Sequence, residues 1–344
     1  MSQDKMVSLR SIFKVIYAAE QAEGVGARVR RSIGTSGMRN FTPFLMLDHF
    51  NVSPDAGFPD HPHRGQETVT LVMKNYMLHE DFTGSNGILR PGDLQFMTAG
   101  KGIVHSEMPY SIDGKNVEGM QLWVDLPENL KHSKPRYRDL RSEEIPIVKP
   151  NDKVEVKVIS GKSYGVESLK DLAYTPMDYY WFTVLPGGEF EQFIKPEFNG
   201  FLYVLNGSIE LKDKKDEKDD NKFEKINEHY SVFFKRDGDS IKGRVPNDSL
   251  KTDFVIIAGQ ALDQPIVQYG PFVETTKEGI YNAFNDYQSS SNGFEKARGW
   301  SSDIGKGVDE GLFRVKSNSL SSQGLPLEAK DHKIILPKDE LWVF

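Results

Sequence analysis

Two short pairs of metal-binding side chains constrain how this chain can fold more than any other feature. The first pair is His61 and His63, and the second, further along the chain, is His105 and Glu107. Within each pair the residues are two positions apart, and alternate side chains of a β-strand point to the same face of a sheet. Two such strands facing one another would gather three imidazoles and one carboxylate around a single point. The spacing therefore predicts a β structure with a metal site that uses nitrogen and oxygen ligands and no sulfur.

Short apolar or alternating segments, separated by glycine and proline, run through both halves of the chain. The clearest ones are residues 44–47, 68–73, 94–97, 119–126, 153–159, 180–185, 200–205 and 254–259. Residues 153–159 alternate strictly between apolar and charged side chains, as a half-buried strand does. Many short strands with such punctuation favour a sandwich or a barrel. We therefore expect an all-β chain with two similar barrels in tandem.

A polar segment with several prolines, residues 131–152, separates the two halves. We place an N-terminal domain with the metal site at residues 1–140, a C-terminal domain without metal at 141–314, and a C-terminal extension at 315–344. Charged residues dominate the run at 212–225, and such runs are usually solvated. We expect this run to be an exposed hairpin tip of the second domain.

The composition excludes several classes of protein. None of the 344 residues is a cysteine, which removes disulfides, thiolate metal sites and cysteine nucleophiles, and favours a reducing compartment. The net charge of −7 argues against a broad nucleic-acid-binding surface. The first residues lack the apolar run of a signal peptide, and no stretch of about 18 apolar residues predicts a membrane-spanning helix. We therefore expect no direct contact with nucleic acid or membrane.

The residues around the two pairs leave the identity of the fourth ligand open. Glu67 shares the strand parity of His61 and His63, so parity alone does not choose between Glu67 and Glu107. His79 could support a ligand from behind by hydrogen bonding, or it could serve a loop or the core. The spacing of these residues in the sequence does not decide between the alternatives.

The ligand types narrow the choice of metal. Imidazole and carboxylate suit iron, manganese, nickel, copper or zinc, and they disfavour calcium and magnesium. Four protein ligands on a six-coordinate metal leave two positions for a substrate and dioxygen. A closed structural zinc site is the alternative, although such sites usually use cysteine. No histidine occurs between His132 and His229, where a second barrel would carry its first pair, so we expect only one metal site.

Several longer motifs of this chain resemble the pirin family of the cupin superfamily. They are residues 24–31, 58–65, 79–82, 91–95 and 97–109 and, more loosely, residues 286–288 and 292–297. The resemblance implies a bicupin, which is a pair of tandem jelly-roll-like cupin barrels with a few short helices. It implies one iron site, as Fe(II), in the N-terminal barrel. The implied ligands are His61, His63, His105 and Glu107, which favours Glu107 over Glu67 and leaves Glu67 and His79 as neighbours that could support the ligands.

The resemblance also implies a function, because pirins are associated with quercetin 2,3-dioxygenase activity. The metal would bind the 3-hydroxyl oxygen of a flavonol, and Glu107 could accept the proton. Dioxygen would then add to the activated ring, with release of carbon monoxide. We expect an apolar pocket beside the metal that includes Phe58, Phe96 and Met97.

The alternative role implied by the resemblance is an iron-dependent, redox-sensing nuclear coregulator of transcription. In that role the protein would contact transcription factors, and oxidation of Fe(II) to Fe(III) would change the local charge and a nearby surface loop. For either role we expect a monomer in the cytoplasm, the nucleus or both.

Overall fold

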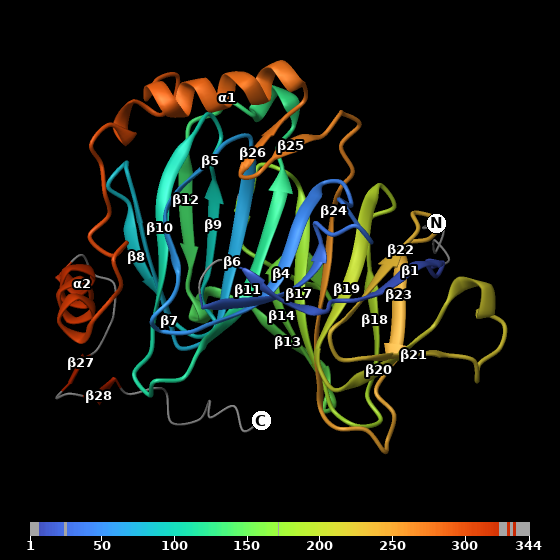
Figure 1. The fold of residues 1–344 in the computed structure, drawn as a ribbon. Coiled ribbons are helices and arrows are strands. Elements are labelled where there is room, and N and C mark those ends of the chain that lie inside the picture. The colour runs from blue at the N-terminus through green and yellow to red at the C-terminus, as the bar shows by residue number, and fades with distance from the viewer. Residues whose placement is uncertain (1–6, 24–25, 171, 323–328, 331–332, 335–344) are drawn as a thin grey trace.

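Two β-barrels stand side by side and account for most of the molecule (Figure 1). The computed structural model describes residues 7–23, 26–170, 172–322, 329–330 and 333–334. The predicted all-β fold of two tandem barrels with a few short helices is confirmed. Of the predicted C-terminal extension, residues 323–328, 331–332 and 335–344 lie outside the described residues.

The first barrel consists of a seven-stranded and a four-stranded antiparallel sheet. The larger sheet has the order β12 (Arg136–Leu140), β9 (Leu94–Thr98), β6 (Gln66–Lys74), β11 (Val117–Asp125), β4 (Phe44–Val52), β3 (Ala27–Ile33) and β2 (Glu20–Glu23). The smaller sheet has the order β5 (Phe58–His63), β10 (Ile103–Tyr110), β7 (Tyr76–Asp81) and β8 (Asn86–Leu89). Both predicted ligand pairs therefore lie in the smaller sheet, on the neighbouring strands β5 and β10.

The second barrel repeats this arrangement of a large and a small sheet. Its larger sheet has the order β1 (Ile12–Tyr17), β22 (Tyr230–Phe234), β19 (Phe198–Asn206), β24 (Thr252–Gln260), β17 (Met177–Val184), β14 (Val154–Ser160) and β13 (Ile147–Asn151). Its smaller sheet has the order β18 (Glu189–Phe193), β23 (Ser240–Arg244), β20 (Ser208–Leu211) and β21 (Glu224–Asn227). Residues 212–223 of the charged run connect the paired strands β20 and β21, and its last two residues begin β21.

The largest apolar core lies between the barrels, where the two seven-stranded sheets pack face to face. Val69 and Leu71 of β6 and Leu122 of β11 contribute to it from the first barrel, and Trp181 and Ile257 from the second. Since strand side chains alternate between faces, the sequence neighbours of the first three residues point into the first barrel, and those of Trp181 and Ile257 point into the second. The sheet thus has one face for joining the barrels and another for lining an interior.

The interiors of the two barrels differ in chemistry. The second barrel is filled by apolar and aromatic side chains, among them Phe182 and Phe254, whose stacked ring centroids are 5.0 Å apart. In the first barrel an apolar cluster around Phe50 and Val72 fills one part only. The remaining part is lined by buried polar residues, including Thr68, Thr70, Asp81, Gln95, His79, His105 and Glu107. As far as the described residues show, the first barrel is therefore the one whose interior suits a polar ligand.

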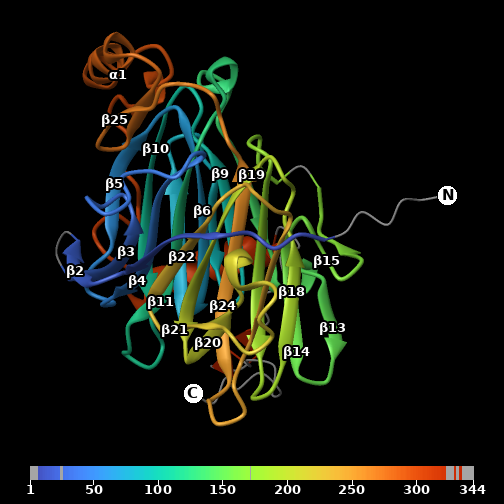
Figure 2. The ribbon, with the colours of Figure 1, turned by 90° about the vertical axis from the view of Figure 1, so that its right-hand side faces the viewer.

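Both ends of the described chain cross the predicted domain boundary. β1, from within residues 1–140, pairs with β22 and so completes the sheet of the second barrel (Figure 2). Near the other end, Phe272 and Phe294 pack against Ile103 of the first barrel. The two barrels are therefore interlocked by exchanged segments.

The C-terminal segments cover the first barrel. They include β25 (Val267–Tyr269), β26 (Phe272–Glu274), α1 (Lys277–Ser289) and α2 (Glu310–Ser322), with α1 over one end of the barrel and α2 at its side (Figure 1). Two-stranded pairs form between β15 (Lys162–Ser163) and β16 (Val166–Glu167), and between β27 (Ala329–Lys330) and β28 (Lys333–Ile334). Within the described residues, neither helix has the length and apolar character needed to cross a membrane.

Candidate metal centre

Three histidines from β5 and β10 converge in the first barrel. His61 lies directly opposite His105 in the antiparallel pair, and His63 follows two residues later on the same face. The ring centroids of His61 and His105 are 4.4 Å apart, and each lies 5.0 Å from the ring of His63. One nitrogen from each ring lies within 4.8 Å of the others, so the three could hold one metal ion. The structure therefore brings together the predicted histidine ligands.

The nitrogens of these histidines are in the state that a metal requires. His63 and His105 are each only 1% exposed, yet Nε2 of His63 and both ring nitrogens of His105 have no hydrogen-bond partner among the described residues. His61 Nδ1 lies 2.8 Å from the carbonyl oxygen of Pro59, which can accept its proton and leave Nε2 free. Buried polar atoms are rarely left unsatisfied in proteins. The donor set therefore fits a bound transition metal.

Burial also keeps two of the rings neutral. Desolvation, followed by the charge of His61, lowers the pKa of His63 well below its ordinary value. The same desolvation lowers the pKa of His105, with smaller effects from the other histidines. A neutral imidazole is the form that binds a metal, so the unprotonated ligands are available without any added base.

Glu107 lies beside the histidine group but is held separately. Its Oε2 is 4.0 Å from His105 Nε2. The pairing of β10 with β5 shifts register between His105 and Glu107, so Glu107 lies opposite Phe58. Thr70 Oγ1 lies 3.0 Å from Oε1, and Gln121 Nε2 donates to Oε2 over 3.2 Å. The carboxylate is thus oriented by two polar neighbours from the larger sheet, and its role as the fourth ligand stays a prediction.

Sequence reasoning missed two residues that support His63. The side-chain amide of Gln66 lies 2.8 Å from His63 Nδ1, and the ring of Trp123 meets His63 edge-on with centroids 5.1 Å apart. Partners of this kind fix the ring orientation and the protonation state of a ligand histidine. Gln66 follows His63 closely in sequence, but no signal in the sequence marks Trp123, which comes from β11.

Glu67 does not join the histidines, because the chain changes sheet before reaching it. β5 ends at His63, and β6 begins at Gln66 in the other sheet. Between them, Gly65 has φ of 75°, and a Cβ there would lie 1.9 Å from the carbonyl oxygen of Val273. This tight turn breaks the parity that relates Glu67 to His61 and His63.

The carboxylate of Glu67 instead joins the two barrels. It accepts hydrogen bonds from the backbone N–H groups of Tyr174 and Thr175 and from the hydroxyl of Thr98. The same alternation of faces removes Phe96 from the expected pocket. Phe96 belongs to the core between the barrels, whereas its neighbour Met97 packs under the C-terminal segments.

His79 lies inside the first barrel but outside the group of three histidines. Its Nε2 is 3.1 Å from Asp139 Oδ2, and its ring stacks on Tyr137 with centroids 5.9 Å apart. It therefore has a partner of its own and does not hydrogen-bond to any of the three predicted histidine ligands.

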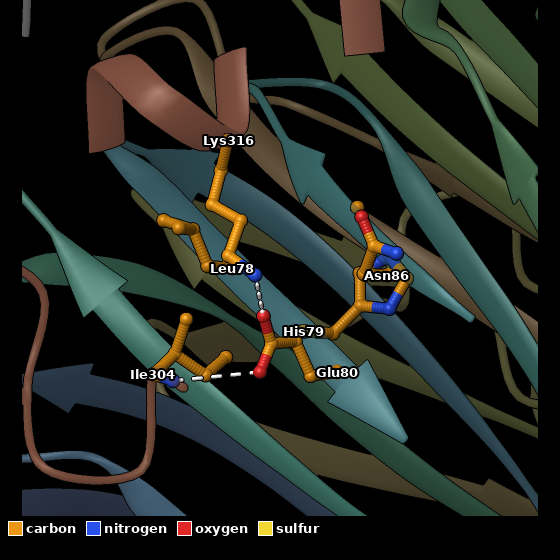
Figure 3. A pocket seen from close by; sticks show the side chains of 7 residues that line it. Leu78, His79, Glu80, Asn86, Ile304 and Lys316 are labelled. Carbon is orange, nitrogen blue, oxygen red and sulfur yellow. Dashed lines mark hydrogen bonds and ion pairs between the residues drawn. The ribbon is translucent and has the colours of Figure 1, made fainter. Parts of the chain in front are cut away.

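The side chain of Glu80 attaches α2 to the outside of the barrel (Figure 3). It pairs with Lys316 and accepts hydrogen bonds from the backbone N–H groups of Asp303 and Ile304. A shallow hollow with no room for a water molecule lies at this contact, and none of the three histidines lines it. The hollow therefore reflects the packing of α2 rather than the metal centre.

Comparisons with known proteins agree with this architecture. The family model "Pirin" matches residues 26–124, and the model "Pirin C-terminal cupin domain" matches residues 179–293. Pirin from Homo sapiens is 43% identical over 303 residues, which are 87% of this chain and 100% of that protein. A pirin-like protein from Solanum lycopersicum is 43% identical over 291 residues, which are 85% of this chain and 96% of that protein.

A solved structure shows the same arrangement. The crystal structure of quercetin 2,3-dioxygenase from Acinetobacter baumannii matches with a TM-score of 0.73 and 25% sequence identity. The match covers 82% of this chain and 98% of that protein.

Proposed function

Because this chain belongs to the pirin family, we propose that it is an iron-dependent dioxygenase that cleaves flavonols, of the quercetin 2,3-dioxygenase type. The observation that carries the proposal is the group formed by His61, His63 and His105. These ligands lie in a polar interior, while the matching interior of the second barrel is filled with apolar side chains. The similarity to a quercetin 2,3-dioxygenase supports the same reaction class.

The ligand set supports Fe(II) as the resident metal. Three imidazoles with a neighbouring carboxylate are suited to a redox-active transition metal that keeps open positions. When bound, the metal would supply Lewis acidity, which lowers the pKa of a hydroxyl group that it coordinates. Elemental analysis of protein purified from its own cells would identify the metal, and zinc at one ion per chain would contradict the proposal.

Glu107 is the residue that we propose as the proton acceptor. Its carboxylate lies beside His105 and is oriented by Thr70 and Gln121, so its position is fixed before a substrate enters. Its oxygen can take the proton that the 3-hydroxyl of a flavonol loses. General-base groups of this kind contribute about 10²- to 10⁴-fold to a rate. Glu107→Gln should therefore lower kcat by a factor in that range.

The proposal is tested by loading the protein with Fe(II) and following the near-visible band of quercetin under air. We expect turnover well above that of free iron, and its loss in His61→Ala together with loss of bound metal. His132→Ala is the matched control, because His132 is exposed and pairs with Glu274 instead of joining the group. Stoichiometric metal binding without turnover would reject the enzyme and favour the coregulator alternative.

A further inference from the structure

Two of the histidines in the metal centre have opposite kinds of hydrogen-bond partner at Nδ1. His61 Nδ1 lies 2.8 Å from the backbone carbonyl oxygen of Pro59, which can only accept a hydrogen bond. His63 Nδ1 lies 2.8 Å from Nε2 of the Gln66 side-chain amide, which can only donate one. His61 therefore has its proton on Nδ1, as a metal at Nε2 requires, whereas His63 has its proton on Nε2.

A metal at Nε2 of His63 requires a proton at Nδ1. The neutral imidazole that binds a metal carries one proton, on the ring nitrogen that the metal does not occupy. Nε2 is the available nitrogen, because it is buried without a hydrogen-bond partner among the described residues, while Nδ1 faces Gln66. In that state the N–H at Nδ1 and the amide NH₂ of Gln66 would both be donors, directed at one another. The amide of Gln66 must then change its orientation.

The other end of the same amide is the acceptor that this state needs. Oε1 of Gln66 is buried and has no hydrogen-bond partner in the described part of the chain. The two ends of a glutamine amide have nearly the same size, so a rotation of about 180° around the last side-chain bond exchanges them in the same space. The rotation points Oε1 at His63 Nδ1 and breaks no hydrogen bond of Oε1.

The hydrogen bond that the rotation gives up leads to the C-terminal segments. Nε2 of Gln66 also donates to the carbonyl oxygen of Pro271 over 3.1 Å, in the turn between β25 and β26. That oxygen accepts a second hydrogen bond, from the backbone N–H of Arg64 over 3.3 Å. The carbonyl oxygen of Pro271 therefore keeps a donor after the amide has turned.

We propose that Gln66 is a positioning residue with two states. In the metal-free protein its amide donates to His63 Nδ1 and to Pro271, and on metal binding the amide turns over and accepts the proton of His63 Nδ1. The ring loses one proton from Nε2 and gains one at Nδ1, so its charge does not change. An acceptor at this position fixes the ring and makes it a stronger ligand. The inference rests on the metal centre of the proposed function and is independent of the flavonol reaction.

Two replacements of Gln66 distinguish an acceptor from a donor at this position. Ionised glutamate only accepts hydrogen bonds, and methionine has a similar length but accepts only weakly. We expect Gln66→Met to weaken Ni(II) binding, measured by calorimetry, by about 10- to 100-fold. Gln66→Glu should bind Ni(II) at least as tightly as the wild type and lower the reduction potential of bound iron, because a carboxylate makes His63 more basic. Equal losses of Ni(II) affinity in both variants would overturn the proposal.

Gln192 offers a matched control in the second barrel. It is 2% exposed, and its Nε2 donates to the carbonyl oxygens of Lys162 and Phe193. Gln192→Glu and Gln192→Met should lower the free energy of unfolding as the Gln66 variants do, but leave Ni(II) affinity and the reduction potential of bound iron unchanged. Equal changes at Gln192 and Gln66 would mean that the effects reflect stability alone, and would also overturn the proposal.

A measurement on the wild type makes the test independent of how well the variants fold. Nitrogen NMR of the imidazoles shows which ring nitrogen carries the proton. We expect the proton of His63 on Nε2 without metal and on Nδ1 in zinc-loaded protein. A proton on Nδ1 in both forms, or no proton on Nδ1 with zinc bound, contradicts the two states.

The outcomes separate this inference from the proposed activity. The expected change at His63 and the expected order of Ni(II) affinities uphold the role of Gln66 even if the iron-loaded protein does not cleave quercetin. Cleavage of quercetin does not rescue the inference if Gln66→Glu and Gln66→Met behave alike. Failure of the wild type to bind Ni(II) or zinc overturns both.

Discussion

The affinity of the metal centre should depend only weakly on pH in the mildly acidic range. A proton competes with the metal at each ligand imidazole. For a histidine with the ordinary pKa of 6.5, lowering the pH from about 7.5 to about 5.5 weakens binding by about tenfold, or about 1.4 kcal/mol. Three such histidines would together weaken it by about a thousandfold.

Burial changes this expectation for two of the three ligands. The pKa values of His63 and His105 lie well below 6.5, so neither ring takes up a proton in this range. Without the contributions of these two rings, the loss of affinity should fall at least about a hundredfold short of the thousandfold expected for three ordinary histidines.

Titration with Ni(II) at several pH values would measure this dependence. The ring of Trp123 lies 5.1 Å from that of His63, so its fluorescence should be quenched as the metal binds. Trp123→Phe tests the assignment of the signal, and calorimetry gives the affinity independently. A short peptide with three exposed histidines should lose about a thousandfold in metal affinity over the same pH range. A loss approaching a thousandfold in the folded protein would refute the argument that burial protects the ligands.

Three further outcomes follow from the same contacts. Without metal, the free energy of unfolding should fall as the pH drops below 6.5, by up to about 2.7 kcal/mol per unit. In this range the unfolded chain binds protons at both positions, whereas His63 and His105 stay neutral in the folded chain. A free energy of unfolding, measured by denaturant titration, that does not change with pH would contradict this expectation. Glu67→Gln should cost about 1–3 kcal/mol, because an amide NH₂ would face backbone donors, but bound metal measured by elemental analysis should not change. Phe254→Ala should cost about 3–5 kcal/mol in thermal or chemical unfolding and leave the metal centre intact, because it empties the interior of the second barrel.

The convergence of the three histidines was predictable from sequence because it depends on local geometry. The two-residue spacing within each pair fixes the face, and β5 and β10 pair as that reasoning required. The same reasoning misled for Glu67, since the turn at Gly65 transfers the chain to the other sheet. Parity holds only within one uninterrupted strand, and the sequence did not show where β5 ends.

The residues that surround the ligands could not be predicted from the spacing of residues in the sequence. Trp123 and Tyr137 approach the interior from β11 and β12, which are brought there by the curvature and pairing of the larger sheet. Asp81 lies in residues 79–82, one of the motifs that resemble the pirin family, but the sequence did not predict its position relative to the histidines. Only the register of β7 against β10 places it opposite His105.

The sequence by itself determined the β character of the chain, the absence of thiolate ligands and the three histidines that could hold a metal. These depend on residue type and on short-range periodicity, which the chain carries in every conformation. The tertiary structure decided which polar groups share an interior and how the exchanged ends interlock the barrels. It also decided which face of each strand lies between the barrels and which lies inside one of them. Those choices depend on contacts between segments far apart in the chain, and only the packing of the two sheets of each barrel fixes them.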